Sequence, residues 1–254
     1  MMNEYEDQND AIQEYWDSQR PLLETIKQKG GVANYVNSLA SAAQFFNANN
    51  HEVCCIDERT TAGVIHFAGS GILDQDEAVQ VIRHAGAQDV YSHAGCGAAD
   101  LAFEKLSPDE KNKFANAEEY AKWWAKEVAR KAGIEYKGHL PVEPNFHIAR
   151  VAYYDGTGTF DAALCAKLLP LGFVISRRYL NKDYALKELD LSIQIAFGVH
   201  GFGKERFTQQ TPFTIIPIAD ANNNRFSLEQ LTSEAREVAN QYGDSVSVDG
   251  FVAT

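Results

Sequence analysis

The chain has 254 residues, of which 45% are hydrophobic and 23% are charged, and its formal net charge is −12. This length allows one large domain with a substantial core. The acidic charge argues against nucleic acid or an anionic membrane surface as a partner, because both require a basic face. No stretch approaches the roughly 20 apolar residues of a membrane helix. The acidic start also lacks the layout of a signal peptide, so we expect a cytoplasmic protein.

The spacing of apolar residues predicts a helical arm followed by alternating strands and helices. The arm covers residues 1–50, with one helix over 10–28, interrupted near Pro21, and a second over 32–46. Beyond it we expect, in chain order, strands 52–57 and 64–68, helix 74–86, strand 89–93, helices 97–106 and 117–132, a loop over 138–144, strand 146–154, helix 160–169, strand 172–177, a strand within 191–199, strand 213–218 and helix 228–242. Such alternation is typical of βαβ units. The sequence therefore predicts an α/β fold with a central, mostly parallel β-sheet flanked by helices.

Two short cysteine-bearing segments each follow a predicted strand. The first is Cys55-Ile56-Asp57-Glu58-Arg59, and the second is His93-Ala94-Gly95-Cys96. Parallel sheets bind ligands beyond the carboxyl ends of their strands, where both segments are expected to lie. Two cysteines and one histidine form a ligand set for Zn²⁺ that leaves one tetrahedral position for water. We therefore predict a zinc site with the ligands Cys55, His93 and Cys96.

Asp57 and Arg59 are the predicted catalytic pair beside the metal. Residues two apart on an extended backbone point the same way, so Arg59 can hold the Asp57 carboxylate ionised and oriented. Asp57 could then accept a hydrogen bond from a zinc-bound hydroxide, or it could itself occupy the fourth metal position. The sequence leaves both alternatives open.

The remaining cysteines and histidines have simpler interpretations. Cys54 is expected in the core because it faces away from Cys55, with a redox pair of the two as the alternative, and Cys165 is also expected in the core. His66 and His200 are candidates for a proton shuttle. The other histidines outside the metal site, His147 among them, are expected to be surface or structural residues.

The pattern Cys-x-Asp-x-Arg followed by His-x-x-Cys-Gly-Ala resembles the β-class carbonic anhydrases, zinc enzymes that interconvert carbon dioxide and bicarbonate. The resemblance implies zinc ligands at Cys55, His93 and Cys96, and an aspartate–arginine dyad at Asp57 and Arg59. Two further segments are similar to family elements, namely Ala68-Gly69-Ser70-Gly71 and Tyr154-Asp155 followed by Gly158. The resemblance covers roughly positions 50–105 and, more faintly, 146–160.

The chain departs from the family pattern where the family commonly lines its substrate pocket. His66, Phe67 and Ser70 replace an arginine and two asparagines, and the loop from Arg59 to Val64 is shorter than is usual. We therefore weigh three functions. The first is zinc-dependent reversible hydration of carbon dioxide to bicarbonate. The second is hydrolysis of carbon disulfide or carbonyl sulfide at the same site, and the third is a non-catalytic zinc-binding protein whose fourth metal position is closed.

We expect three segments within one domain: the arm 1–50, a zinc-binding α/β core 51–160 and a C-terminal α/β portion 161–254. A faint echo of the first cysteine segment at Val174-Ile175-Ser176-Arg177-Arg178 is either a degenerate half-repeat without ligands or a coincidence. The arm carries more apolar surface than two isolated helices can hide. Together with the resemblance to a family that pairs its subunits near the metal, this predicts a homodimer or a higher homo-oligomer.

Overall fold

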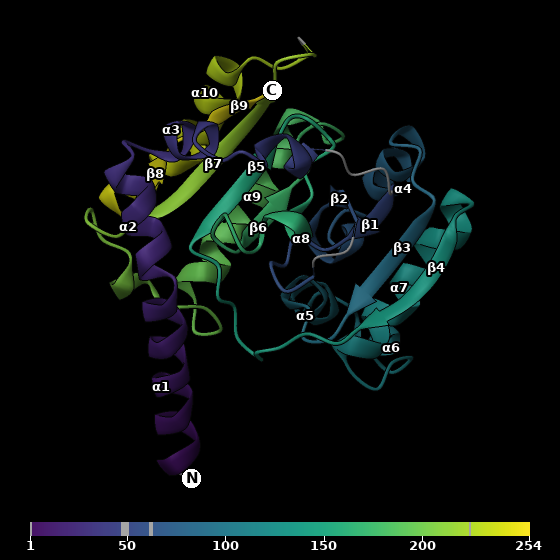
Figure 1. The fold of residues 1–254 in the computed structure, drawn as a ribbon. Helices are drawn as coiled ribbons and strands as arrows, with labels where there is room; N and C mark the ends of the chain where they lie inside the picture. Colours follow the sequence, from purple (N-terminus) through teal and green to yellow (C-terminus); the bar gives the residue numbers. More distant parts are fainter. Residues whose placement is uncertain (1, 47–50, 61–62, 224) are drawn as a thin grey trace.

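Two parallel β-sheets form the centre of the protein (Figure 1). The computed structural model describes residues 2–46, 51–60, 63–223 and 225–254. Sheet A has the order β2-β1-β3-β4 and contains β1 (Glu52–Cys54), β2 (Ile65–His66), β3 (Asp89–His93) and β4 (Glu135–Leu140). Sheet B has the order β6-β5-β7-β8, contains β5 (Val151–Asp155), β6 (Gly172–Ile175), β7 (Phe213–Asp220) and β8 (Val246–Val248), and adds β9 (Phe251–Ala253) beside β7. The predicted α/β class with parallel strands is confirmed, although the strands are divided between two sheets.

The two sheets share one strand order and meet along β2 and β6. Ser176 ties these edges together, since its N–H donates to the His66 carbonyl oxygen at 3.1 Å and its Oγ accepts the His66 N–H at 2.8 Å. By strand order β5 is the counterpart of β1, although it lies within the predicted core segment 51–160 and pairs in sheet B. The echo over 174–178 instead begins within β6, the counterpart of β2, and so does not match the shared order.

Helices flank both sheets, as Figure 1 shows. The arm contains α1 (Met2–Ser18), α2 (Arg20–Gln28), α3 (Val32–Asn37) and the 3-10 helix η1 (Ala42–Phe46). The helices that follow sheet A strands in the chain are α4 (Gln75–His84), α5 (Gly97–Glu104), α6 (Pro108–Lys111) and α7 (Ala117–Ala132), with a short 3-10 helix η2 (Ala68–Gly71) after β2. Those associated with sheet B are α8 (Ala162–Cys165), α9 (Lys182–Phe197), α10 (Leu228–Ala239), η3 (Lys204–Arg206) and η4 (Gly243–Ser245).

The apolar side chains of the arm pack on the chain's own second half. Trp16 makes edge-to-face contacts with Phe202 and Phe207, at centroid distances of 5.0 and 5.3 Å. The ring centroid of Phe46 lies 6.0 Å from that of Phe251 in β9. Burial of these rings supplies the hydrophobic free energy that holds the arm in place. Much of the arm's apolar surface is therefore covered within one chain.

The predicted helix 32–46 is divided into α3 and η1, and only the second half of the predicted strand 146–154 is strand β5. Two further predictions gave the wrong type of secondary structure. The expected strand within 191–199 is the end of α9, which begins at the cap Asn181, whose side chain accepts the Tyr184 N–H at 2.9 Å. The β-branched residues at its end are helical because the buried residues of α9, such as Leu189 and Ile193, recur at helical spacing. The first residues of the expected loop over 138–144 belong to β4 (Glu135–Leu140). This polar edge strand is stabilised by its pairing with β3.

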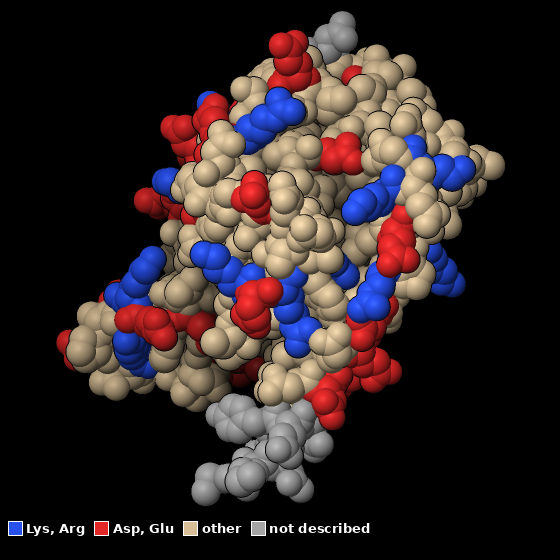
Figure 2. Space-filling model, turned by 90° about the vertical axis from the view of Figure 1, so that its left-hand side faces the viewer, with Lys and Arg blue, Asp and Glu red and all other residues tan. Residues whose placement is uncertain are grey.

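The outer surface of the face drawn in Figure 2 carries acidic and basic side chains interspersed, without one continuous basic field. None of the helices in the described ranges combines the length and the apolar character that crossing a bilayer requires. Cys54 and Cys165 are buried in the core as predicted, and all four cysteines are free thiols.

Glu188 of α9 lies fully in the core, where its carboxylate accepts the Ala68 N–H of η2 at 2.5 Å. Burial raises the pKa of this carboxyl to about 8. A pKa raised on folding means that the native state holds the proton more tightly than the unfolded chain. The associated stability is complete below the unfolded pKa, about 4.3, and is lost as the pH rises through about 8.

We predict that Glu188→Gln removes this loss, because glutamine offers the same acceptor without ionising. Between pH 5 and pH 8 the free energy of unfolding of the native sequence should fall by about 3 kcal/mol more than that of the variant. Urea unfolding at both pH values measures this, with the exposed Glu14→Gln as the control. Parallel pH dependence in Glu188→Gln and the unaltered protein would refute the prediction.

Candidate metal centre

Cys55, His93 and Cys96 converge at the carboxyl ends of β1 and β3. Their ligand atoms lie within 4.8 Å of one another, and all three residues are buried. A tetrahedral Zn²⁺ with bonds of about 2.0 to 2.3 Å separates such ligand atoms by about 3.5 to 3.8 Å. The three residues selected from the sequence are thus brought together at a spacing that a small shift of side chains adapts to zinc.

The His93 ring is oriented for ligation through Nε2. Its Nδ1 lies 2.8 Å from the Ala94 carbonyl oxygen, to which it can donate a hydrogen bond. That bond fixes the tautomer in which Nε2 carries the lone pair. Nε2 is buried and has no hydrogen-bond partner among the described residues. A buried polar atom without a partner is costly, and a metal ion would satisfy it.

The two cysteines lie where the backbone supports a metal ligand. Cys55 Sγ accepts the Gly69 N–H at 3.1 Å, and Cys96 is the residue directly before α5. Gly69 has φ +55, and a Cβ there would lie 2.6 Å from the Ile72 side chain. Glycine is therefore favoured at the position that donates to Cys55. Burial raises the pKa of the Cys55 thiol well above its usual value, and the nearby Cys96 adds to this. A divalent cation would supply the charge that favours the thiolate, so the donor set fits zinc.

Asp57 and Arg59 form a buried, two-pronged ion pair. Arg59 Nε donates to Asp57 Oδ1 at 2.9 Å, and Nη2 donates to Oδ2 at 2.6 Å. The side chains of Arg59 and Asp57 are only 3% and 2% exposed. Burial alone would raise the pKa of Asp57, but the Arg59 hydrogen bonds and the nearby His147 and His93 outweigh it and hold the pKa at about 2. The carboxylate is therefore ionised at neutral pH.

Asp57 lies beside the three candidate ligands and groups instead with Glu58 and His147, a second buried set of acidic and histidine side chains. Its Oδ2 is 3.7 Å from His93 Nδ1, the ring nitrogen that faces away from the metal position. Both Asp57 oxygens are already bound by Arg59. Within the described ranges, the group of potential ligands around Cys55 contains His93 and Cys96 but not Asp57. The engagement of both carboxylate oxygens with Arg59 argues against Asp57 as the fourth metal ligand.

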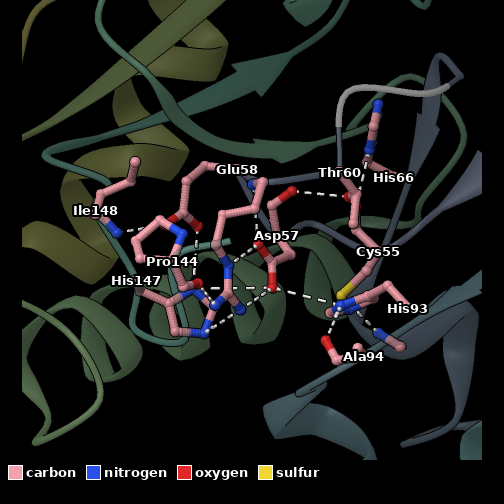
Figure 3. A network of polar contacts seen from close by, with 12 residues as sticks. Cys55, Asp57, Glu58, Thr60, His66, His93, Ala94, Pro144, His147 and Ile148 are labelled. Carbon is pink, nitrogen blue, oxygen red and sulfur yellow. Dashed lines mark hydrogen bonds and ion pairs between the residues drawn. The ribbon is translucent and has the colours of Figure 1, made fainter. Parts of the chain in front are cut away.

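A polar network that the sequence did not predict connects this pair to residues 144–148 (Figure 3). Arg59 Nη1 donates to the Pro144 carbonyl oxygen at 2.8 Å. His147 is buried, with Nε2 3.4 Å from Arg59 Nη2 and Nδ1 3.0 Å from Glu58 Oε2. Glu58 Oε1 accepts the Ile148 N–H at 2.5 Å. Nothing in the sequence near 144–148 signals this role, because the partners are more than 80 residues apart.

The two histidines proposed as proton shuttles have other surroundings. His66 is buried, with Nδ1 2.8 Å from the Cys55 carbonyl oxygen and Nε2 3.2 Å from that of Gly63. With both ring nitrogens against backbone oxygens, His66 supports the backbone of the metal-ligand loop. The His200 side chain is exposed, and its carbonyl oxygen accepts the His147 N–H at 2.6 Å.

No protein-family model, curated protein or solved structure matches this chain. A functional proposal must therefore rest on the side chains and their geometry.

We predict that Cys96→Ala abolishes metal binding, because two remaining ligands cannot hold zinc firmly. The bound zinc should fall from about one equivalent per chain to near zero after dialysis against a weak chelator. Elemental analysis measures this. The matched control is Cys54→Ala, which removes a buried cysteine of β1 outside the candidate ligand set and should leave the metal content unchanged. Equal zinc in the two variants would show that Cys96 is not a ligand.

Proposed function

We propose that this chain is a zinc enzyme that reversibly hydrates carbon dioxide to bicarbonate. The observation that carries the proposal is a Cys₂His cluster of candidate ligands beside a carboxylate that Arg59 holds ionised. Such a ligand set leaves one position of a tetrahedral metal for exchange. When bound, the metal would supply a nucleophile derived from water at near-neutral pH.

Asp57 acts in this proposal as an orienting acceptor. Its pKa of about 2 makes it a poor general base at neutral pH, since efficient proton transfer requires a pKa near the operating pH. An ionised carboxylate can only accept hydrogen bonds, so it fixes the direction of a reacting O–H group. The proton released by the reaction passes to solvent or buffer.

Arg59 and its partners keep Asp57 in place. The planar guanidinium binds both carboxylate oxygens, which a lysine could not reproduce. Pro144 and the His147–Glu58 pair in turn hold Arg59. Positioning of the carboxylate is thereby independent of bulk water, because the pair is buried.

The same site could act on carbonyl sulfide or carbon disulfide, which share the linear, electrophilic carbon of carbon dioxide. The non-catalytic alternative requires a closed fourth metal position, and the engagement of Asp57 with Arg59 argues against Asp57 as the closing group. A cytoplasmic location remains a proposal supported by the four free thiols, which are typical of a reducing compartment.

We predict that the zinc-loaded protein hydrates carbon dioxide in a stopped-flow assay with a pH indicator. Asp57→Asn should lower kcat/KM by about 100-fold while leaving the zinc content unchanged, because it loses an oriented acceptor and no ligand. The exposed Asp10→Asn is the control and should be fully active.

The assay separates the alternatives. Release of sulfide from carbonyl sulfide without hydration of carbon dioxide would replace the proposed substrate. A zinc-loaded protein inactive on all three substrates would support the non-catalytic function. Full activity in Asp57→Asn would remove the role assigned to the carboxylate.

A homodimer is the proposed assembly, on the ground of family resemblance alone, since much of the arm's apolar surface packs within the chain. Light scattering at micromolar concentration should give about twice the chain mass of 28.2 kDa. A mass of one chain over the whole concentration range would exclude the dimer.

A further inference from the structure

A cavity of about 660 Å³ lies between α2 of the arm and the amino ends of β5 and β7. Its walls include Leu23 and Ile26 of α2, Trp16 of α1, and Arg150, Val151 and Thr214 from sheet B. This volume lies within the range of sites for small organic ligands. The metal ligands lie at the carboxyl ends of sheet A strands, and none of them lines the cavity. The cavity is therefore a separate candidate site.

Arg150 is the unusual residue of this cavity. It is 4% exposed, and its guanidinium carbon lies 3.5 Å from the centre of the Trp16 ring. Its Nη1 donates to the Trp16 carbonyl oxygen at 3.2 Å, whereas its Nε is buried without a hydrogen-bond partner. No carboxylate of the residues that the structure describes forms an ion pair with it at 4.0 Å or less.

A buried guanidinium without a carboxylate is costly, and stacking on an aromatic ring offsets only part of that cost. Burial and the nearby Arg20 lower the pKa of Arg150 to about 10, although Asp17, which is paired with Arg20, acts in the opposite direction, so the group still carries its charge at neutral pH. Of the two acidic lining residues, Asp249 is engaged elsewhere, since its Oδ2 accepts the Val32 N–H at 2.7 Å, and Glu24 is exposed on α2. The missing partner of Arg150 is thus an anion.

We propose that this cavity binds a small organic carboxylate, with its charged group at Arg150 and its apolar body against Leu23 and Ile26. A single buried cation matches a monoanion, and the bidentate geometry of a guanidinium matches a carboxylate. The aliphatic walls favour a ligand with an apolar body over a fully hydrated inorganic anion. This site is independent of the proposed reaction at the metal centre.

Isothermal titration of the full chain with benzoate, benzamide and inorganic phosphate tests the proposal. Benzoate should bind, and benzamide, which has the same shape without the charge, should bind about tenfold or more weakly. Phosphate, which lacks an apolar body, should also bind more weakly than benzoate. Arg150→Gln should weaken benzoate binding about tenfold or more, whereas Arg150→Lys should retain part of it because it keeps the charge.

A second pair of variants guards against misfolding of Arg150→Gln. Leu23 is half-buried on α2, so Leu23→Asp places a negative charge in the cavity and should repel benzoate, while the neutral Leu23→Asn should bind it better. The proposal is overturned if benzoate produces no heat at millimolar concentration, if benzamide or phosphate binds as well, or if Leu23→Asp binds benzoate like Leu23→Asn. A dimer that buries the cavity, disrupted by Leu23→Asp, would instead identify an interface between two copies.

Discussion

The buried ion pair between Asp57 and Arg59 is the constraint around which the candidate site is built. Removing two charges from water is costly, and hydrogen bonds to both partners offset this cost. Asp57 accepts three hydrogen bonds from Arg59, counting the backbone N–H, and Arg59 also reaches the Pro144 carbonyl oxygen. Because Pro144 lies between the two sheets in the chain, the geometry of the Cys55 loop depends on the assembly of both.

The two sheets share one strand order, but the aspartates that follow or end their equivalent strands β1 and β5 have different partners. Beyond β1, Asp57 is held by Arg59 beside the candidate metal ligands. Beyond β5, its counterpart by strand order, Asp155 holds its own turn, since Oδ1 accepts the Thr157 N–H at 2.8 Å and Oδ2 accepts the Gly158 N–H at 3.0 Å. At equivalent strand ends, Asp57 thus binds a charged side chain in sheet A, whereas Asp155 binds backbone amides in sheet B.

Polar groups buried between the halves fix how the sheets fit together. Ser176 joins β6 to β2, Glu188 of α9 accepts the Ala68 N–H, and Glu58 accepts the Ile148 N–H. Each of these contacts would leave a buried group unsatisfied if the sheets shifted, which penalises other arrangements. Ala68 directly precedes Gly69, whose N–H is accepted by Cys55 Sγ, so the Glu188 contact also positions a candidate metal ligand.

The sequence by itself determined the α/β class, the extent of strand 89–93 and of helix 117–132, and the five residues of the candidate site. These were accessible because hydrophobic period, caps and the spacing of Cys55, Asp57 and Arg59 are local properties of the chain. It was misled at β4, where pairing with β3 overrode local preference, and at the end of α9, where β-branched residues suggested a strand despite the helical spacing of the buried residues. Only the tertiary structure decided that Glu58 and His147 meet behind Arg59, that the strands divide into two sheets, and that Arg150 is buried without a carboxylate. Such facts depend on residues far apart in the chain, whose contacts leave no pattern in either neighbourhood.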